Sequence, residues 1–389
     1  MSLIERHHPS AGTRLRRGGT AAAAAALTLF AATACGSSGG SPKAAPSAPA
    51  PVTAAPTTPS ALPSGLLSGL PSLSDLKKWN AHDWDTWAKQ QPAFTQAVKG
   101  FWDLQKMLQA KPADPVAPPQ QPTDGGNDPL PSAIQAQAIA HPYSQNPVDG
   151  KVFFDVGPDK HAVCSATVIS DPQHPGKSNL IWTAGHCLTS GKTAQRYQNI
   201  AFVPAFNSSG EVSHGKQPTS KSQFAPFGVW DVSDAVTSPQ WTAEGGETGS
   251  AASQYDFSIM KVVNPDANGK SLEETVGGSV PVWFNAPRDQ LKITAIGYPS
   301  APPFDGMEME RCNGGQPSRL SFDASRPAME VIGCTMTAGS SGGGWFAVKD
   351  GRPALVSNTS IGPQESGWLA GPYLDDVAKS ALDYLSKKN

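Results

Sequence analysis

From residue 148 onward the sequence is a series of short apolar segments separated by turn residues, and this pattern most constrains the fold. Each segment is too short for a typical helix and is bounded by Gly, Pro, Asn or Asp. A series of short strands without intervening helices predicts an all-β sandwich or barrel. Apolar residues at helical spacing predict one helix over 373–385, which closes the domain. The expected strands are 152–154, 162–169, 180–183, 200–204, 257–263, 293–298, 329–332, 344–348 and 354–359.

The N-terminal part of the chain differs in composition, and this difference sets the expected domain boundaries. Residues 1–34 have the pattern of a signal peptide, and residues 35–71 are a tether rich in Pro, Ala and Ser, which buries too little apolar surface to fold. Apolar residues at helical spacing predict a short helical segment over 72–110, which is either an element packed on the main domain or a propeptide or inhibitory segment. Residues 111–147 are a Pro-rich linker, and residues 148–389 form the folded domain.

Charge and composition exclude several classes of function. The 389 residues include 30 basic and 32 acidic side chains, so the net charge of −2 gives no overall reason to bind nucleic acid. Beyond the N-terminus no apolar stretch reaches the roughly 18 residues of a membrane span. The sequence has no phosphate-binding glycine loop and no His, Asp or Glu set at metal-ligand spacing. We therefore expect no cofactor and no transition metal, while the sequence leaves structural calcium open. We also expect the protein to be a monomer.

The N-terminal segment predicts export. Arg14, Arg16 and Arg17 precede a short apolar run at 21–34 that ends in small residues. Cys35 follows this run directly and is followed by glycine, which resembles the lipobox of bacterial lipoproteins. In that interpretation Cys35 is lipidated and becomes the mature N-terminus. The alternative is simple cleavage before Cys35, which leaves a free cysteine.

Two motifs contain residues suited to nucleophilic catalysis. The motif TAGHC places His186 beside Cys187 directly after an apolar segment, where a disulfide would hold a general base rigidly. A structural histidine is the alternative. The motif GSSGG places Ser341 in a glycine-rich loop, where a tight turn can direct backbone N–H groups at a developing oxyanion. A flexible Gly/Ser loop is the alternative.

A third motif, YDFSI, places Asp256 at the start of an apolar segment. A carboxylate buried there is costly unless it is paired, and an imidazole N–H is a suitable partner. An ordinary aspartate at a strand edge is the alternative. The three motifs taken together weaken each of these simpler interpretations.

The order His186, Asp256, Ser341 is the order found in chymotrypsin, and it differs from the orders of subtilisin and the α/β-hydrolases. With TAGHC, YDFSI and GSSGG, residues 148–389 resemble trypsin-like serine peptidases of the chymotrypsin fold, and among them actinobacterial secreted peptidases similar to glutamyl endopeptidases. The resemblance implies two six-stranded antiparallel β-barrels with the active site between them. It implies that His186 is the general base, Asp256 its orienting partner and Ser341 the nucleophile. It also implies an oxyanion hole formed by the N–H groups of Gly339 and Ser341.

The cysteines other than Cys35 suggest two disulfides in an oxidising compartment. Four cysteines permit three pairings, and the sequence by itself does not choose among them. The resemblance selects Cys164 with Cys187 and Cys312 with Cys334.

Ser340 departs from the pattern of the family. Many trypsin-like enzymes have an aspartate immediately before the nucleophile, and it receives the N-terminal ammonium that an activating cut creates. Ser340 carries no charge. Activation through that ion pair is therefore not expected.

The resemblance also suggests which residues line the substrate pocket. Thr335 stands six positions before Ser341, where an aspartate would favour basic substrates. Ser357, Asn358 and Thr359 lie on the segment that would line the pocket, and no histidine of the kind used for glutamate recognition occurs there. Thr359 stands where glycine is common, which predicts a narrow pocket for small side chains.

We therefore predict an extracytoplasmic serine endopeptidase, either lipid-anchored at Cys35 on the outer face of the cell membrane or secreted. Its partner would be a polypeptide substrate, and its membrane contact would be the lipid alone. A catalytically inactive lipoprotein that uses the fold as a binding or structural module is one alternative. An esterase with the same three residues is another.

Overall fold

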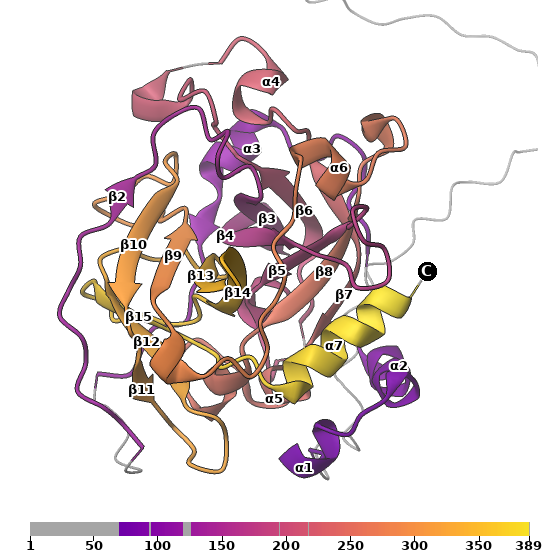
Figure 1. Ribbon diagram of the computed structural model, residues 1–389. Coiled ribbons are helices and arrows are strands. Elements are labelled where there is room, and N and C mark those ends of the chain that lie inside the picture. Colours follow the sequence, from indigo (N-terminus) through magenta and orange to yellow (C-terminus); the bar gives the residue numbers. More distant parts are fainter. Residues whose placement is uncertain (1–69, 93–94, 120–125, 194, 217, 389) are drawn as a thin grey trace, which may run out of the picture. The chain divides into compact units, whose positions relative to one another are not determined.

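The computed structural model describes residues 70–92, 95–119, 126–193, 195–216 and 218–388. The predicted signal peptide, Cys35 and almost all of the predicted tether lie outside the described residues. The described chain consists mainly of β-strands and ends in a helix, so the predicted all-β fold is confirmed (Figure 1).

The first half of the fold is a closed antiparallel barrel of six strands. The strands pair in the order β4-β3-β6-β7-β8-β5, and pairing of β4 with β5 closes the barrel. Val152 lies opposite Cys164 on one side and Phe202 on the other, and all three side chains are buried in the same core. The strands are β3 (Asp149–Gly157), β4 (Lys160–Ile169), β5 (Leu180–Thr183), β6 (Gln198–Pro204), β7 (Trp230–Thr237) and β8 (Ser258–Val263).

The second half contains a five-stranded sheet, β14-β13-β9-β10-β2, and a three-stranded sheet, β11-β12-β15. Ile293, Ile332 and Trp345 come from both sheets and are buried in one core. Residues of this half therefore pack as a unit beside the barrel. The strands are β2 (Gln137–Ala138), β9 (Ile293–Gly297), β10 (Glu310–Gly315), β11 (Ser318–Leu320), β12 (Met329–Cys334), β13 (Gly344–Lys349), β14 (Arg352–Asn358) and β15 (Gly367–Gly371).

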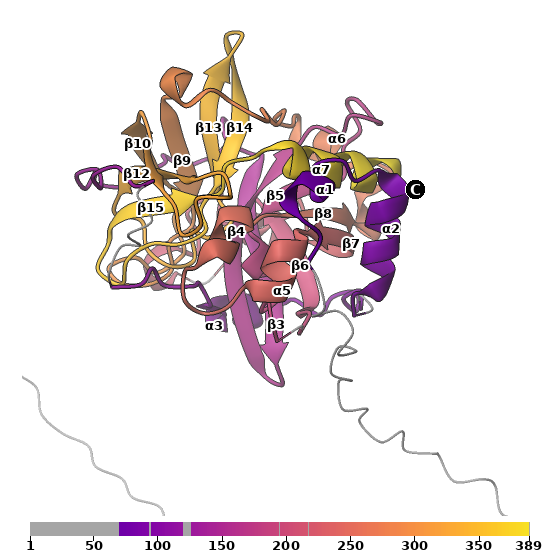
Figure 2. The ribbon, with the colours of Figure 1, turned by 90° about the horizontal axis from the view of Figure 1, so that it is seen from below.

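The N-terminal and C-terminal helices pack against each other on the first barrel (Figure 2). The Trp84 indole N–H donates to Ser380 Oγ at 3.0 Å, and its ring stacks on Tyr384. Among the described residues, every helix is too short or too polar to cross a lipid bilayer. The α-helices are α1 (Leu73–Leu76), α2 (Ala81–Gln90), α3 (Leu104–Gln109), α4 (Lys221–Phe224), α5 (Pro239–Glu244), α6 (Leu272–Val276) and α7 (Asp376–Lys387).

The predicted linker runs along both halves. Strand β1 (Lys111–Pro112) pairs in parallel with β4 of the first barrel. Further along the chain, β2 pairs with β10 of the second half. Between these strands, Val116 forms bridges with Thr248 and Gly362. The linker therefore crosses from one half of the fold to the other.

Two disulfides join Cys164 to Cys187 and Cys312 to Cys334, which is the pairing that the resemblance implied. The first ties β4 to the 3-10 helix η1 (Gly185–Cys187), directly after β5. The second ties β10 to β12 and so joins the two sheets of the second half.

Removal of the Cys312–Cys334 bond is expected to destabilise the fold. The bond spans 22 residues, and a loop of that length contributes about 3 kcal/mol to the free energy of unfolding in the chain-entropy model. Urea unfolding of Cys312→Ala/Cys334→Ala measures this loss. An unchanged unfolding free energy would show that the bond adds no stability.

Candidate active site

His186 lies on η1, immediately after the buried strand β5, and only 3% of it is exposed. The Cys164–Cys187 bond anchors the next residue to β4. A side chain at Gly185 would come within 2.8 Å of Trp241, so glycine lets the turn pack against α5. Covalent and packing constraints therefore fix the position of the imidazole.

Asp256 is fully buried between the 3-10 helix η3 (Ala251–Tyr255) and β8, and its carboxylate is surrounded by donors. One oxygen accepts from the backbone N–H of His186 at 2.8 Å, and the other lies 2.7 Å from His186 Nδ1. Ser360 Oγ donates to this second oxygen at 2.6 Å. A carboxylate in this position holds the proton on Nδ1, which leaves Nε2 free to accept one.

Ser341 lies in the turn between β12 and β13, where glycine is required at two positions. Gly339 has φ +98°, and a Cβ there would lie 2.6 Å from Ser300 Oγ. Gly342 has φ +77°, and a Cβ there would lie 2.0 Å from Thr183 Oγ1. The backbone N–H of Ser165, on β4, donates to Ser341 O at 2.7 Å. The turn is thus held against the first barrel.

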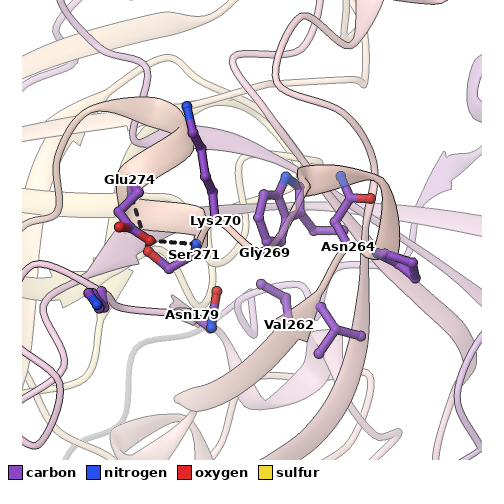
Figure 3. A pocket seen from close by; sticks show the side chains of 11 residues that line it. Asn179, Val262, Asn264, Gly269, Lys270, Ser271 and Glu274 are labelled. Carbon is purple, nitrogen blue, oxygen red and sulfur yellow. Dashed lines mark hydrogen bonds between the residues drawn. The ribbon is translucent and has the colours of Figure 1, made fainter.

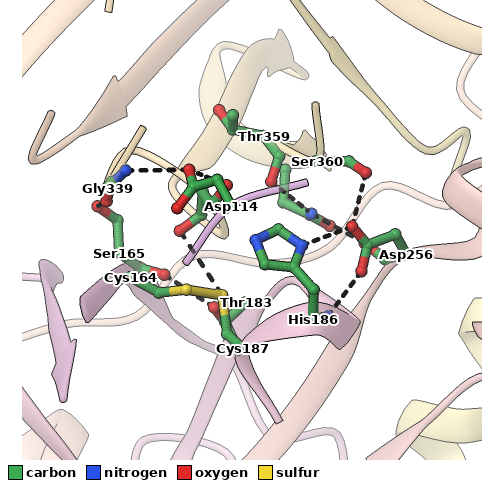
Figure 4. Close-up of a disulfide and its surroundings, with 12 residues drawn as sticks. Asp114, Cys164, Ser165, Thr183, His186, Cys187, Asp256, Gly339, Thr359 and Ser360 are labelled. Atoms are coloured by element: carbon green, nitrogen blue, oxygen red, sulfur yellow. Dashed lines mark hydrogen bonds and ion pairs between the residues drawn. A yellow bond between two sulfur atoms is a disulfide. The ribbon is translucent and has the colours of Figure 1, made fainter. Parts of the chain in front are cut away.

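The hydroxyl of Ser341 meets a residue from the linker. Ser341 Oγ donates to Asp114 Oδ2 at 2.5 Å, and the N–H of Gly339 donates to the same oxygen at 2.9 Å. Nε2 of His186 is buried and makes no hydrogen bond with any described residue. The structure therefore pairs His186 with Asp256 (Figure 4). It pairs Ser341 with Asp114.

Two carboxylates act on the imidazole. Burial by itself lowers the pKa of His186, but the charge and hydrogen bond of Asp256 and the charge of Asp114 together raise it above its usual value. Burial raises the pKa of Asp114, although the charge of His186 and the hydrogen bonds from Ser341 and Gly339 partly oppose this. The carboxylate at Ser341 is therefore an electrostatic part of this site.

Two solved structures share this architecture. A thermostable serine protease, AL20, from an extremophilic microorganism is 30% identical with a TM-score of 0.50, and the match covers 63% of this chain and 100% of that one. Protease Anisep from Arthrobacter nicotinovorans is 29% identical with a TM-score of 0.50, and the match covers 65% and 100% of the two chains. The chain has the chymotrypsin-type fold of serine proteases.

A third solved structure is more distantly similar. A Glu endopeptidase in complex with MPD is 15% identical with a TM-score of 0.48, and the match covers 67% of this chain and 99% of that one. That similarity is too distant to inform on substrate preference. No protein-family model and no curated protein matches the chain.

Sequence reasoning missed two residues that contact the site in this serine-protease fold. Ser360 donates to the Asp256 carboxylate. Asn358, which the sequence suggests as a pocket residue, instead donates from Nδ2 to the Asp256 carbonyl at 3.1 Å. Asp114 contacts Ser341 from the predicted linker. For Asp114 the one local signal was Pro115, because the residue before a proline is biased towards extended backbone.

Three of the four suggested pocket residues are buried in the second half, and Thr335 is half-buried. Ser357, Asn358 and Thr359 are each at most 2% exposed. Ser357 Oγ donates to a backbone carbonyl, Asn358 Oδ1 accepts from the Trp182 indole, and Thr359 Oγ1 accepts from the Trp345 indole. Thr335 Oγ1 accepts from the backbone N–H of Ala136. These side chains are already engaged, so the preference for small substrate side chains remains a prediction.

A cavity of about 430 Å³ lies elsewhere on the first barrel, between β8 and α6 (Figure 3). Its wall includes Lys270, Ser271 and Glu274. The Glu274 carboxylate accepts from the backbone N–H of Ser271, and the Ser271 hydroxyl accepts from the N–H of Glu274. These polar groups cap helix α6, and the residues expected to be catalytic do not line the cavity.

Proposed function

We propose that the chain is an extracytoplasmic serine endopeptidase with Ser341 as nucleophile, His186 as general base and Asp256 as orienting carboxylate. The observation that carries this proposal is the convergence of donors beside Ser341. The N–H of Gly339 donates to the same Asp114 carboxylate oxygen that accepts from Ser341 Oγ, so the donors of this turn meet at one negatively charged acceptor. This is the arrangement that stabilises the oxyanion of a tetrahedral intermediate.

The mechanism follows from these positions. Ser341 Oγ attacks a peptide carbonyl carbon while its proton passes to His186 Nε2, and Asp256 stabilises the imidazolium. The oxyanion accepts hydrogen bonds from the Gly339 and Ser341 N–H groups. The intermediate then collapses, His186 protonates the leaving amine, and an acyl-enzyme remains on Ser341. Water, deprotonated by His186, hydrolyses that ester and regenerates the serine.

The backbone around the site supports a polypeptide as the substrate. Val116 is held in extended form, its N–H donating to Glu247 O at 3.0 Å and its carbonyl accepting from the N–H of Gly249 at 2.9 Å. The N–H of Ala117 donates to Gly362 O at 2.9 Å. These contacts use main-chain groups, which any peptide supplies and a small ester lacks. Relative turnover of peptide and ester substrates compares the two classes.

A non-catalytic binding module is the second candidate, and the contact between Ser341 and Asp114 favours it. In this arrangement the serine donates to a carboxylate instead of to His186. The same side chains would then serve only to hold the linker. Labelling of the serine separates the two candidates, because only an activated nucleophile reacts quickly.

The test is labelling of the full chain with a fluorophosphonate, read by mass spectrometry of the adduct. We expect the adduct on Ser341 and none in Ser341→Ala. Asp114→Ala is labelled in parallel, so that the carboxylate cannot mask the nucleophile. If neither the unsubstituted chain nor Asp114→Ala forms an adduct on Ser341, the endopeptidase proposal fails.

We further propose that the protein is exported, acts as a monomer and carries a lipid on Cys35. The two disulfides support an oxidising compartment outside the cytoplasm. Mass spectrometry of the mature protein from the producing cell tests the lipid and any processing point together. An unmodified N-terminal cysteine would exclude lipidation.

A further inference from the structure

We propose that residues 111–118, here named the strap, keep the peptidase latent by placing the Asp114 carboxylate in the oxyanion hole and on the nucleophile. This inference rests on the proposed function, because a latent site requires that Ser341 be a nucleophile. It goes further by assigning an intramolecular inhibitor to a segment that the sequence presents as a linker.

The contacts of Asp114 are those that an oxyanion would make. Its Oδ2 accepts from the N–H of Gly339 and from Ser341 Oγ, and the buried Oδ1 makes no hydrogen bond with any described residue. Asp114 as a whole is partly exposed, so the carboxylate alone is inserted into the site. A charged acceptor at these donors competes directly with the developing oxyanion of a substrate.

The same contact keeps the proton of Ser341 away from the general base. The proton of Ser341 Oγ is directed to Asp114, so it is not available to His186 Nε2. The group facing the serine is a carboxylate, which is a much poorer electrophile than a peptide carbonyl. The strap therefore presents no peptide carbonyl to Ser341 through this contact, and it can occupy the site without being cut there.

The strap backbone is held on two sides of the site. Val116 forms parallel bridges with both Thr248 and Gly362, and Ala117 donates to Gly362. Gly362 lies two residues after Ser360, which hydrogen-bonds to Asp256. Backbone pairing thus positions the strap next to the catalytic residues.

Both flanks of the strap are anchored to the body of the fold. At its start, Lys111 and Pro112 pair with Ala162 and Val163 on β4. Downstream, Asp128 forms a two-point ion pair with Arg319, at 2.8 and 3.0 Å. Because the inhibitor is tethered at both ends, its effective concentration at the site is high and it competes well with free substrate.

The sequence of the strap suits this role. Prolines follow Lys111, Asp114 and Ala117, so every third residue of the strap is proline. The residue before each proline is biased towards extended backbone, and this spacing favours an extended chain. Binding in the site therefore costs the strap less conformational entropy than it would cost a flexible peptide.

The test is the rate at which a fluorophosphonate labels Ser341 in the full chain and in Asp114→Ala. We expect Asp114→Ala to react about 10- to 100-fold faster, because a charge-assisted contact to the nucleophile and the oxyanion donor is lost. Asp114→Asn keeps the shape but loses the charge, so its rate should lie between the two. Circular dichroism and the thermal midpoint check that each variant is folded.

Asp289→Ala is the matched control, because Asp289 is an exposed aspartate on the 3-10 helix η5 (Arg288–Gln290), outside the strap and the proposed site. Its labelling rate should equal that of the unsubstituted chain. Equal, measurable rates for the unsubstituted chain and Asp114→Ala would overturn the latent state and leave the endopeptidase intact. Absence of labelling in both would overturn the proposed function, and the strap proposal with it.

The pH dependence supplies a second readout. The charges acting on His186 are the carboxylates of Asp256 and Asp114, while Trp241 of α5 and the neighbouring disulfide add none. The neutral imidazole is the active base, so labelling rises as the pH passes the pKa of His186. The Asp114 charge raises that pKa, so Asp114→Asn should move the rise to lower pH. A shift to higher pH, or none, would contradict the electrostatic effect of the Asp114 charge on His186.

Discussion

The variant His186→Ala is expected to lower kcat for a peptide substrate by about a millionfold, because losing one member of a catalytic triad costs nearly as much as losing all three. Without the imidazole, the proton of Ser341 has no acceptor and the leaving amine has no donor. The measurement is hydrolysis of a fluorogenic peptide. Both proteins compared, with and without His186→Ala, also carry Asp114→Ala, so that the strap contact is absent from each.

The control for this prediction is His82→Ala. His82 is an exposed residue in the first turn of α2 and lies outside the proposed site. Its removal should leave kcat unchanged. If His186→Ala retained more than a small part of the rate, the assignment of the general base would be wrong.

The variant Asp256→Asn is expected to lower kcat by about 10⁴-fold with much less effect on KM. The Asp256 oxygens accept from the backbone N–H of His186, from its Nδ1 and from Ser360 Oγ. With the amide oxygen kept at the backbone N–H, the amide NH₂ would face Nδ1. That nitrogen would then become an acceptor, Nε2 would hold the proton, and the base could not accept one from Ser341.

Ser360→Ala is compared with Asp256→Asn, because it should have a smaller effect on kcat. It removes one hydrogen bond to the Asp256 carboxylate but keeps the tautomer of His186, so we expect a fall in kcat of about tenfold. Similar losses for Asp256→Asn and Ser360→Ala would argue against control of the tautomer. They would indicate instead that both residues act through the stability of the site.

The strands were predicted where the local pattern was regular, and they were missed where it was interrupted. β5 has the four buried residues expected of a core strand, and its bounds match the prediction. β7 was missed, because a register shift between Val232 and Asp234 breaks its alternation of apolar and polar residues. β10 was also missed: it contains a register shift and ends in two glycines, and it is joined to its neighbours by pairing with β9 and by the Cys312–Cys334 bond.

The candidate catalytic residues could be named from the sequence because each carries a local signal. His186 stands beside a cysteine, Asp256 begins an apolar strand, and Ser341 lies among glycines that permit positive φ. Backbone preference and side-chain chemistry of this kind depend on neighbouring residues alone. Pairing of the cysteines did not follow from local pattern and required the resemblance to a family.

The presence of Asp114 at Ser341 could be learned only from the tertiary structure. Asp114 and Ser341 are 227 residues apart, and no spacing rule relates them. Their contact exists because β1 pairs with β4, and Val116 pairs with residues from both halves of the fold. The sequence by itself determined which side chains could do chemistry and which segments could form strands. Which carboxylate lies on the serine was decided by long-range backbone pairing, because such pairing depends on partners that are distant in the chain.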